Sequence, residues 1–286
     1  AFRLRERHKL EQLRPTVRQV LAHFDDLCRW EKELEFLLGK QRRALLERRV
    51  QEVNPEELAR IERDRWQLGI RPVPDLRGHL ERIGIRTFEL EVPGGEFSGF
   101  SWWHEEYGPC ILVNAKDIKG RRVFTFAHEY AHILRPDQPS LCDLSLDVPE
   151  ERFADRFAVS FLMPAADLSA QFERRPIMGT TPDAQEIGRL AKRYGVSLEA
   201  LGRRLEELEL LPFGTTASLL SQWQVSRQDF GGVKGPRWWR QLGQPYVSLA
   251  LEAYRSGHIS LSRLALYLGL DVRKALQAVQ QTEGGG

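Results

Sequence analysis

The sequence has few of the features that would place it in a membrane or in an oxidising compartment. Among its 286 residues there are only three cysteines, too few for a disulfide framework in a chain of this size. No apolar run approaches the length needed to cross a bilayer, and the first residues do not have the pattern of a signal peptide. We therefore expect a cytoplasmic protein with no membrane partner.

Net charge is almost absent as well. Lys and Arg together number 42 and Asp and Glu number 40, which leaves a formal charge of +2. This balance excludes a global bias toward nucleic acid, although 29% of the residues are charged. With 42% hydrophobic residues, the chain has the composition of a globular protein and the length for two domains or for one with appendages.

One short segment, residues 124–134, has the spacing of a metal site. His128 and His132 are four residues apart, so on a helix they share a face and can close on one ion. Glu129 lies one step round the helix, where it can reach a water bound to that ion and act as general base. Two histidines on an ordinary amphipathic helix would give the same pattern, so a third ligand decides between the two interpretations.

A second predicted helix, which begins near Pro149, offers that ligand. Glu151 and Asp155 are again four apart and share one face of it. Glu151 would bind the metal, and Asp155 would accept the N–H of a ligating histidine and fix its tautomer. The alternative is a solvated acidic stripe, which fits Glu150 better than Asp155. Two imidazoles and a carboxylate favour one Zn²⁺ per chain, and Mn²⁺ can substitute in an assay.

The sequence of the two predicted helices and of the segments next to them resembles that of the ImmA/IrrE metallopeptidases. The resemblance rests on residues 122–134, on the pattern Glu-x-x-Ala-Asp-x-Phe-Ala at 151–158, and on Leu-Met-Pro at 162–164. Upstream, residues 99–102 and 111–114 are similar to the hairpin that precedes the active-site helix in that family. Carried over by position, the resemblance implies the same ligands and the same base as the helical spacing does.

The resemblance also implies a fold and a function. The fold would be α+β, a zincin-like core of a small mixed sheet and the active-site helices, with helical N- and C-terminal appendages. The function would be that of a zinc-dependent endopeptidase that cleaves a partner helix-turn-helix repressor. Cleavage would derepress stress-response, mobile-element or phage-defence genes. The alternative is a DNA-binding transcriptional regulator whose metal site is structural or vestigial.

Helix and strand patterns divide the chain into four parts. We expect a helical segment over 1–66, the metallopeptidase core over 67–170, a helix-turn-helix-like segment over 171–213 and a helical region over 214–286. In the core, residues 85–92 alternate as a strand should, and residues 96–103 and 109–114 predict a hairpin with its loop at 104–108.

In the third part, one helix is predicted to end at Gly195 and the next to be capped by Ser197. If this pair bound DNA, the second helix would offer Arg203 and Arg204 to the groove. Its glutamates would repel phosphate, however, so we favour packing on the peptidase or docking of the repressor.

Three residues near the hairpin suggest sharper hypotheses. His104 and Tyr107 would stabilise the oxyanion that forms as water attacks a peptide carbonyl. Exposed loop residues with no special role are the commoner case. Cys110 would occupy the open position of the zinc as an inhibitory fourth ligand, because thiolate is a good zinc ligand. A buried, inert cysteine is the commoner case.

Aromatic residues stand among arginines at the end of a loop, punctuated by Gly and Pro, that begins at residue 227. Arg237, Trp238, Trp239 and Arg240 suit single-stranded nucleic acid, because bases stack on the rings and arginines hold the backbone. Single-stranded DNA is therefore a candidate activating signal. In the alternative that we favour, the two tryptophans anchor the loop to the domain.

Overall fold

The computed structural model describes residues 14–40, 42, 44–46, 53–95, 97–135, 140–142, 149–173, 182–222 and 236–283. The chain gathers into two compact units. The first comprises Ala1–Leu46, Leu80–Lys116 and Val233–Gly286, and the second comprises Glu47–His79 and Asp117–Gly232. Both units are discontinuous in sequence and cut across the four predicted parts, whose boundaries stay a prediction. In the described part of the chain, every helix is too short or too polar to span a membrane.

The first unit is built around a small sheet. Its elements are α2 (Pro15–Leu37), β1 (Arg86–Leu90), η1 (Pro93–Gly95), β2 (Gly99–His104), β3 (Gly108–Asn114), α11 (Arg237–Leu242), α12 (Gln244–Arg255), α13 (Leu261–Leu268) and α14 (Val272–Glu283). β2 and β3 form the predicted antiparallel hairpin, whereas β1 pairs with β3 in parallel, with Arg86 opposite Cys110. A helix-rich chain with a small mixed sheet is compatible with the predicted α+β class.

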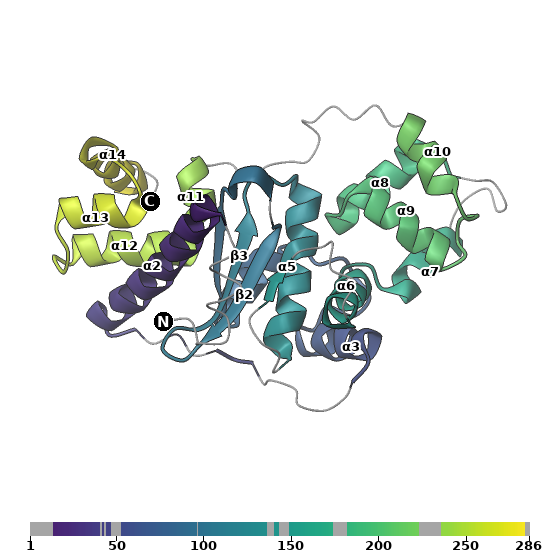
Figure 1. The fold of residues 1–286 in the computed structure, drawn as a ribbon, viewed down its shortest axis with the longest axis horizontal. Helices are drawn as coiled ribbons and strands as arrows, with labels where there is room; N and C mark the ends of the chain where they lie inside the picture. The colour runs from purple at the N-terminus through teal and green to yellow at the C-terminus, as the bar shows by residue number, and fades with distance from the viewer. Residues whose placement is uncertain are drawn as a thin grey trace. The chain divides into compact units, whose positions relative to one another are not determined.

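Helices from both ends of the sequence cover this sheet. α2 and α11 pack on β1, and α12 packs on α2, so segments more than 200 residues apart lie side by side (Figure 1). Phe24 of α2 contacts the edges of Phe88 and Phe100 at ring distances of 6.0 Å. α2 ends shortly before Gly39, which has a φ of 63° that side chains disfavour.

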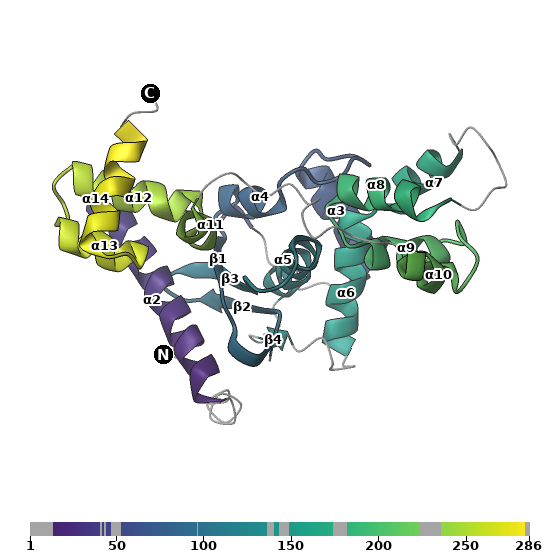
Figure 2. The same ribbon diagram turned by 90° about the horizontal axis from the view of Figure 1, so that it is seen from above.

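The C-terminal helices α12, α13 and α14 form a cluster at one end of this unit (Figure 2). Gly257 and Gly269 follow the ends of α12 and α13, with φ angles of 74° and 63°. The prediction of a loop that extends to Arg240 is wrong, since residues 237–240 lie in α11. Pro236 precedes this helix, and its fixed φ of −57° suits a helix start.

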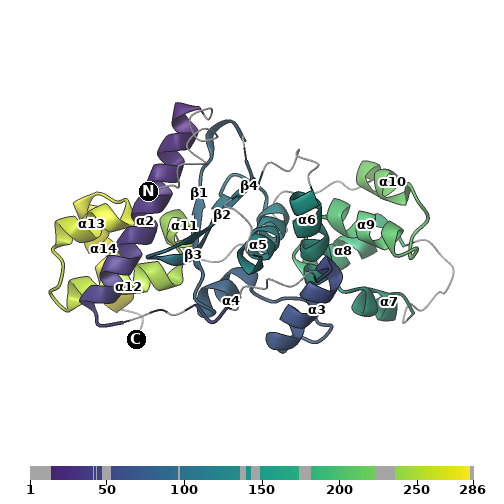
Figure 3. The same cartoon turned by 60° about the horizontal axis from the view of Figure 1, so that its bottom comes forward.

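Three packed helices form the centre of the second unit. Its elements are α3 (Pro55–Arg65), α5 (Lys119–Leu134), β4 (Ser140–Cys142), α6 (Pro149–Leu162), α7 (Ala165–Glu173), α8 (Ala184–Tyr194), α9 (Leu198–Glu207) and α10 (Thr215–Gln222). The residues of the short α4 (Leu76–Arg82) are divided between the two units. α6 lies between α5 and α3 (Figure 3). At the start of α3, Asn54 Oδ1 accepts the N–H of Glu57 at 2.8 Å.

The predicted helix-turn-helix of the second unit is present. α8 ends at Gly195, with a φ of 70°, and Ser197 Oγ accepts the N–H of Ala200 at 3.0 Å at the start of α9. The turn between them lies against α5. A Cβ on Gly120 of α5 would come within 2.7 Å of the Ser197 nitrogen, so only glycine fits there. The pair therefore packs on the helix that carries the predicted histidine ligands.

Candidate metal centre

Three side chains from α5 and α6 converge in the interior of the second unit. His128 Nε2 lies 3.0 Å from Glu151 Oε2 and 3.2 Å from His132 Nε2. His132 Nε2 lies 3.5 Å from Glu151 Oε1, and all three side chains are buried. A tetrahedral ion with bonds of about 2.0–2.1 Å sets its ligand atoms roughly 3.3 Å apart. The donor set and its spacing therefore fit one metal ion.

Asp155 fixes the orientation of the first histidine. Its Oδ1 lies 2.8 Å from His128 Nδ1, and its side chain is 49% exposed while that of His128 is fully buried. A proton held on Nδ1 by this carboxylate leaves the Nε2 lone pair directed at the other two ligands. The predicted partnership of Asp155 with a ligating histidine has the geometry it requires.

The second histidine is held in its neutral form. The pKa of His132 is lowered to about 4, first because burial disfavours the imidazolium and then because His128 lies beside it. Neutral imidazole is the form that binds metal ions. At neutral pH His132 is therefore ready to act as a ligand without losing a proton.

Glu129 follows His128 directly in α5 and is fully buried, with both carboxylate oxygens shielded from solvent. Arg135, at the end of the same helix, places its guanidinium 4.2 Å from the centre of the Phe153 ring in α6. This cation–π contact holds the end of α5 against α6. The ring that faces Arg135 belongs to another helix, so no pattern within α5 indicates this contact.

A buried pair behind the ligands was missed by sequence reasoning. Tyr130 OH donates to Glu62 Oε2 of α3 at 2.6 Å, and the Tyr130 ring packs against Trp66 and Phe161. Tyr130 lies between the two histidines in sequence and on the opposite face of α5, so this contact fixes the helix from behind. One signal was available: Glu62 is four residues after Leu58, at an inward position of α3.

Two further predicted site residues, His104 and Tyr107, lie in the β2–β3 turn of the first unit. His104 Nδ1 accepts the N–H groups of Glu106 and Tyr107 at 3.0 and 3.3 Å. Its ring stacks on Tyr107 with centroids 3.8 Å apart and an interplanar angle of 7°. These contacts give both residues a role in the turn, and their role as oxyanion stabilisers stays a prediction.

Cys110 lies inside the first unit. It is fully buried, its Sγ donates to the Gly108 carbonyl at 3.5 Å, and it neighbours the thiol of Cys28. Burial, followed by the hydrogen bond with Cys110, raises the pKa of the Cys28 thiol. The group of potential metal ligands found in the described residues contains no cysteine. The inhibitory role of Cys110 stays a prediction.

The predicted nucleic-acid contacts, Arg237 to Arg240, lie on α11. Arg237 forms an ion pair with Glu91, and the rings of Trp238 and Trp239 lie 5.5 Å apart and are half-buried. Since α11 packs on β1, these features fit the anchoring alternative. Contact with single-stranded DNA stays a prediction.

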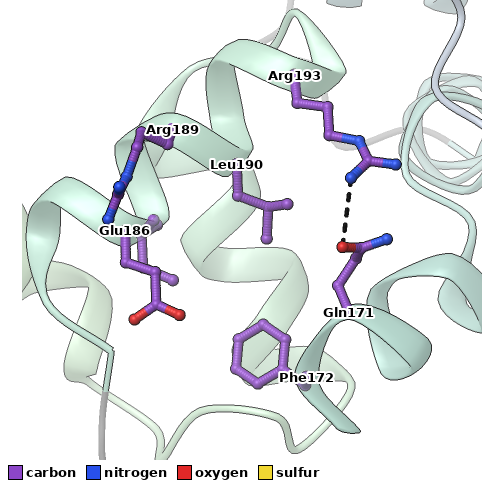
Figure 4. Close-up of a pocket in the computed structure, with 7 residues that line it drawn as sticks. Gln171, Phe172, Glu186, Arg189, Leu190 and Arg193 are labelled. Carbon is purple, nitrogen blue, oxygen red and sulfur yellow. Dashed lines mark hydrogen bonds between the residues drawn. The ribbon is translucent and has the colours of Figure 1, made fainter. Parts of the chain in front are cut away.

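A hollow between α7 and α8 lies elsewhere in the second unit (Figure 4). Its lining includes Phe172 and Leu190, and Arg193 Nη1 donates to Gln171 Oε1 at 3.3 Å at its edge. None of the metal-ligand candidates lines it. The hollow is therefore distinct from the group of candidate ligands on α5 and α6.

Comparison with known proteins adds one informative match. The family model described as IrrE N-terminal-like domain (Peptidase_M78) matches residues 80–206, a segment that contains all three candidate ligands. No curated protein matches the chain. Among solved structures, a Mycobacterium tuberculosis transcriptional regulator is similar, with 18% identity and a TM-score of 0.28. The match covers 64% of this chain and 46% of the regulator, so the chain spans less than half of that protein.

Proposed function

Residues 80–206 belong to the ImmA/IrrE family of metallopeptidases, and on this basis we propose that the protein is a zinc-dependent endopeptidase. The observation that carries the proposal is the buried group of His128, His132 and Glu151, with the buried Glu129 next to it in α5. A purely structural metal site needs the histidines but no general base beside them. The same group supports a zincin-like arrangement of α5 and α6.

Two imidazole nitrogens and a carboxylate form a donor set that zinc prefers, and manganese would substitute for it. When bound, zinc supplies a Lewis acid that polarises the peptide carbonyl and lowers the pKa of water toward neutrality. His128, His132 and Glu151 would hold the ion. The buried positions of all three side chains limit the access of bulk water, which strengthens electrostatic interactions within the site.

The remaining chemistry falls to Glu129 and Asp155. Glu129 accepts a proton at its carboxylate from the attacking water as the water oxygen bonds to the peptide carbon. It then donates that proton to the leaving nitrogen as the C–N bond breaks. Asp155 keeps the proton of His128 on Nδ1 throughout, so that Nε2 stays a ligand.

The proposed substrate is a helix-turn-helix repressor, and this part rests on the family resemblance. Cleavage of the repressor would release the genes that it silences, whether for stress response, mobile elements or phage defence. The test is incubation of the purified protein, loaded with Zn²⁺ or Mn²⁺, with the repressor encoded beside it. Wild type is compared with Glu129→Gln at matched, measured metal content.

We expect wild type to cut the repressor at one site and Glu129→Gln to leave it intact. Equal cleavage by both proteins would contradict the assignment of the base. Intact repressor in every reaction, together with intact unstructured peptides, would remove the endopeptidase proposal. A regulatory role with a structural metal site would then replace it.

A further inference from the structure

The C-terminal helices α13 and α14 have the form of a helix-turn-helix. Ser260 caps the start of α13, and Gly269 ends it in the left-handed conformation. Three residues separate the two helices, and Asp271 Oδ1, the last of them, accepts the N–H of Lys274 at 2.8 Å in the first turn of α14. Two packed helices joined by a short turn that contains glycine define this motif.

The motif has an apolar core of its own. Residues from both helices close it, namely Leu264, Ala265 and Leu268 of α13 and Ala275, Ala278 and Val279 of α14, all of them buried. The alanines let the two helices approach closely, and α13 lies between α14 and α12, which it contacts on either side (Figure 1). The second helix is therefore held with its opposite face toward solvent.

That outward face of α14 is basic and rich in amides. Arg273, Lys274, Gln277, Gln280 and Gln281 are all exposed, and positions 273, 277 and 280 follow one side of the helix. α14 carries no acidic side chain before its last residue, Glu283. Arginine pairs in a bidentate way with guanine and glutamine with adenine, and arginine and lysine side chains also contact phosphate oxygens.

The surroundings of this face add to its positive charge. Arg255, at the end of α12, reaches α14 and donates to Thr282 Oγ1 at 2.5 Å, and the exposed His258 follows in the next turn. Lys274 pairs with Asp271 at 3.1 Å, but both side chains are more than half exposed, so this pair is weak and open to exchange.

From these observations we propose that the cluster α12–α14 binds duplex DNA, with α14 in the major groove. Arg273, Gln277 and Gln280 would read base edges, and Lys274 and Arg255 would contact phosphates. The exposed apolar residues Leu266, Val272 and Leu276 are 53%, 48% and 41% accessible, and such side chains can contact thymine methyl groups. The surface shares no residue with the metal-ligand group or with α11, and the inference stands without the peptidase proposal.

The test uses the full chain and a fluorescein-labelled duplex of mixed sequence, with binding followed by fluorescence anisotropy at low and at physiological salt. A duplex enriched by the protein from a random pool is measured in parallel. We expect binding that weakens as salt rises, because phosphate contacts release counterions. The double variant Arg273→Ala/Lys274→Ala should lose roughly tenfold or more in affinity, as a lost guanine contact and a lost phosphate contact require.

Three controls make the result specific. Arg203→Ala removes an exposed arginine from α9 and should bind both duplexes as wild type does. Circular dichroism and thermal melting should show that the double variant is folded. Glu129→Gln should also bind DNA normally, so a failed peptidase assay and a failed DNA assay remain distinguishable.

Three results would overturn the proposal. The first is the absence of duplex binding by wild type at low salt, and the second is equal binding by wild type and the double variant. The third is that Leu276→Ser changes the oligomeric state in analytical ultracentrifugation while the double variant has no effect on DNA. In that case the apolar residues of this face form an interface between protein chains, and Arg273 and Lys274 do not bind DNA.

Discussion

The two helix-turn-helix motifs of the described chain have similar turns and present different faces. In α8–α9 the turn runs from Gly195 to the cap Ser197, and in α13–α14 it runs from Gly269 to the cap Asp271. Both glycines are left-handed, with φ angles of 70° and 63°. The turn therefore identifies the motif in both places but does not say what the second helix does.

The second helices differ in where their arginines point. Arg204 of α9 is buried, where it donates to the Met163 carbonyl at 3.4 Å and pairs with Glu207 at 2.9 Å. Arg273 and Lys274 of α14 are exposed. The turn before α9 also lies against Gly120 of the helix that carries the metal ligands. We infer that α8–α9 supports the metal site and that α13–α14 faces a partner.

Metal removal should produce the largest difference in behaviour between the two motifs. If zinc joins α5 to α6, a ligand concentration about a thousandfold above the dissociation constant stabilises the folded state by about 4 kcal/mol. Chelation should therefore speed amide hydrogen exchange in α5, α6 and the adjoining α8–α9 turn. Exchange in α13–α14 should stay the same. Hydrogen exchange is measured by mass spectrometry on peptides. If exchange is equally faster in both motifs, the metal site does not stabilise α8–α9 selectively.

The next largest effect is expected at the contact between α5 and the α8–α9 turn. Gly120→Val places a branched side chain against the backbone of residues 196 and 197, at distances of 2.7–2.8 Å from its Cβ. Overpacking against backbone should lower the free energy of unfolding by about 3 kcal/mol. Zinc affinity, measured by competition with a chromophoric chelator, should fall with it. Ser262→Ala, at an exposed position of α13, serves as the control and should change neither quantity.

Local signals in the sequence were sufficient for much of the site. Helical periodicity alone predicts that His128 and His132 share a face of one helix and that Glu151 and Asp155 share a face of another, and the structure brings the three candidate ligands together. The helix end at Gly195 and the cap Ser197 likewise follow from backbone preferences that act over a few residues. Features with a local cause could be predicted without knowing the fold.

What the sequence could not show depends on contacts between distant segments. The parallel pairing of β1 with β3 and the Tyr130–Glu62 hydrogen bond join residues whose separation no periodic pattern encodes. The direction of Arg204 is a similar case. Arg203 and Arg204 are neighbours with the same chemistry, and only the packing of α9 decides which of them is buried.

That pair of neighbours provides a test within a single helix. Arg204→Ala removes two hydrogen bonds at a side chain that is 4% exposed, and should cost about 1–2 kcal/mol of unfolding free energy. Arg203→Ala removes an exposed pair with Glu199 and should change stability by less than about 0.5 kcal/mol. Chemical denaturation of both variants measures the difference. Equal losses would mean that α9 does not support the core through Arg204.

The smallest of the expected effects is the response to acid of the two N-terminal caps, Asp271 of α14 and Ser197 of α9. The pKa of Asp271 is lowered from 3.8, chiefly because its carboxylate accepts the backbone N–H of Lys274 and then also its side chain. A depressed pKa means that the ionised cap stabilises α14 above pH 3.8 and that this stabilisation is lost as the pH falls through the lower, folded value. Ser197, which caps α9, does not titrate.

Nuclear magnetic resonance can follow both caps in one titration. Below pH 3.8 the amide resonance of Lys274 should shift, and this amide should lose protection from hydrogen exchange. The amide of Ala200, which donates a hydrogen bond to Ser197 Oγ, should not respond to the protonation of Asp271. Asp271→Asn keeps a capping oxygen without the charge, so it should abolish the transition at Lys274. A transition that persists in this variant would assign the acid response to another group and leave the two caps equivalent.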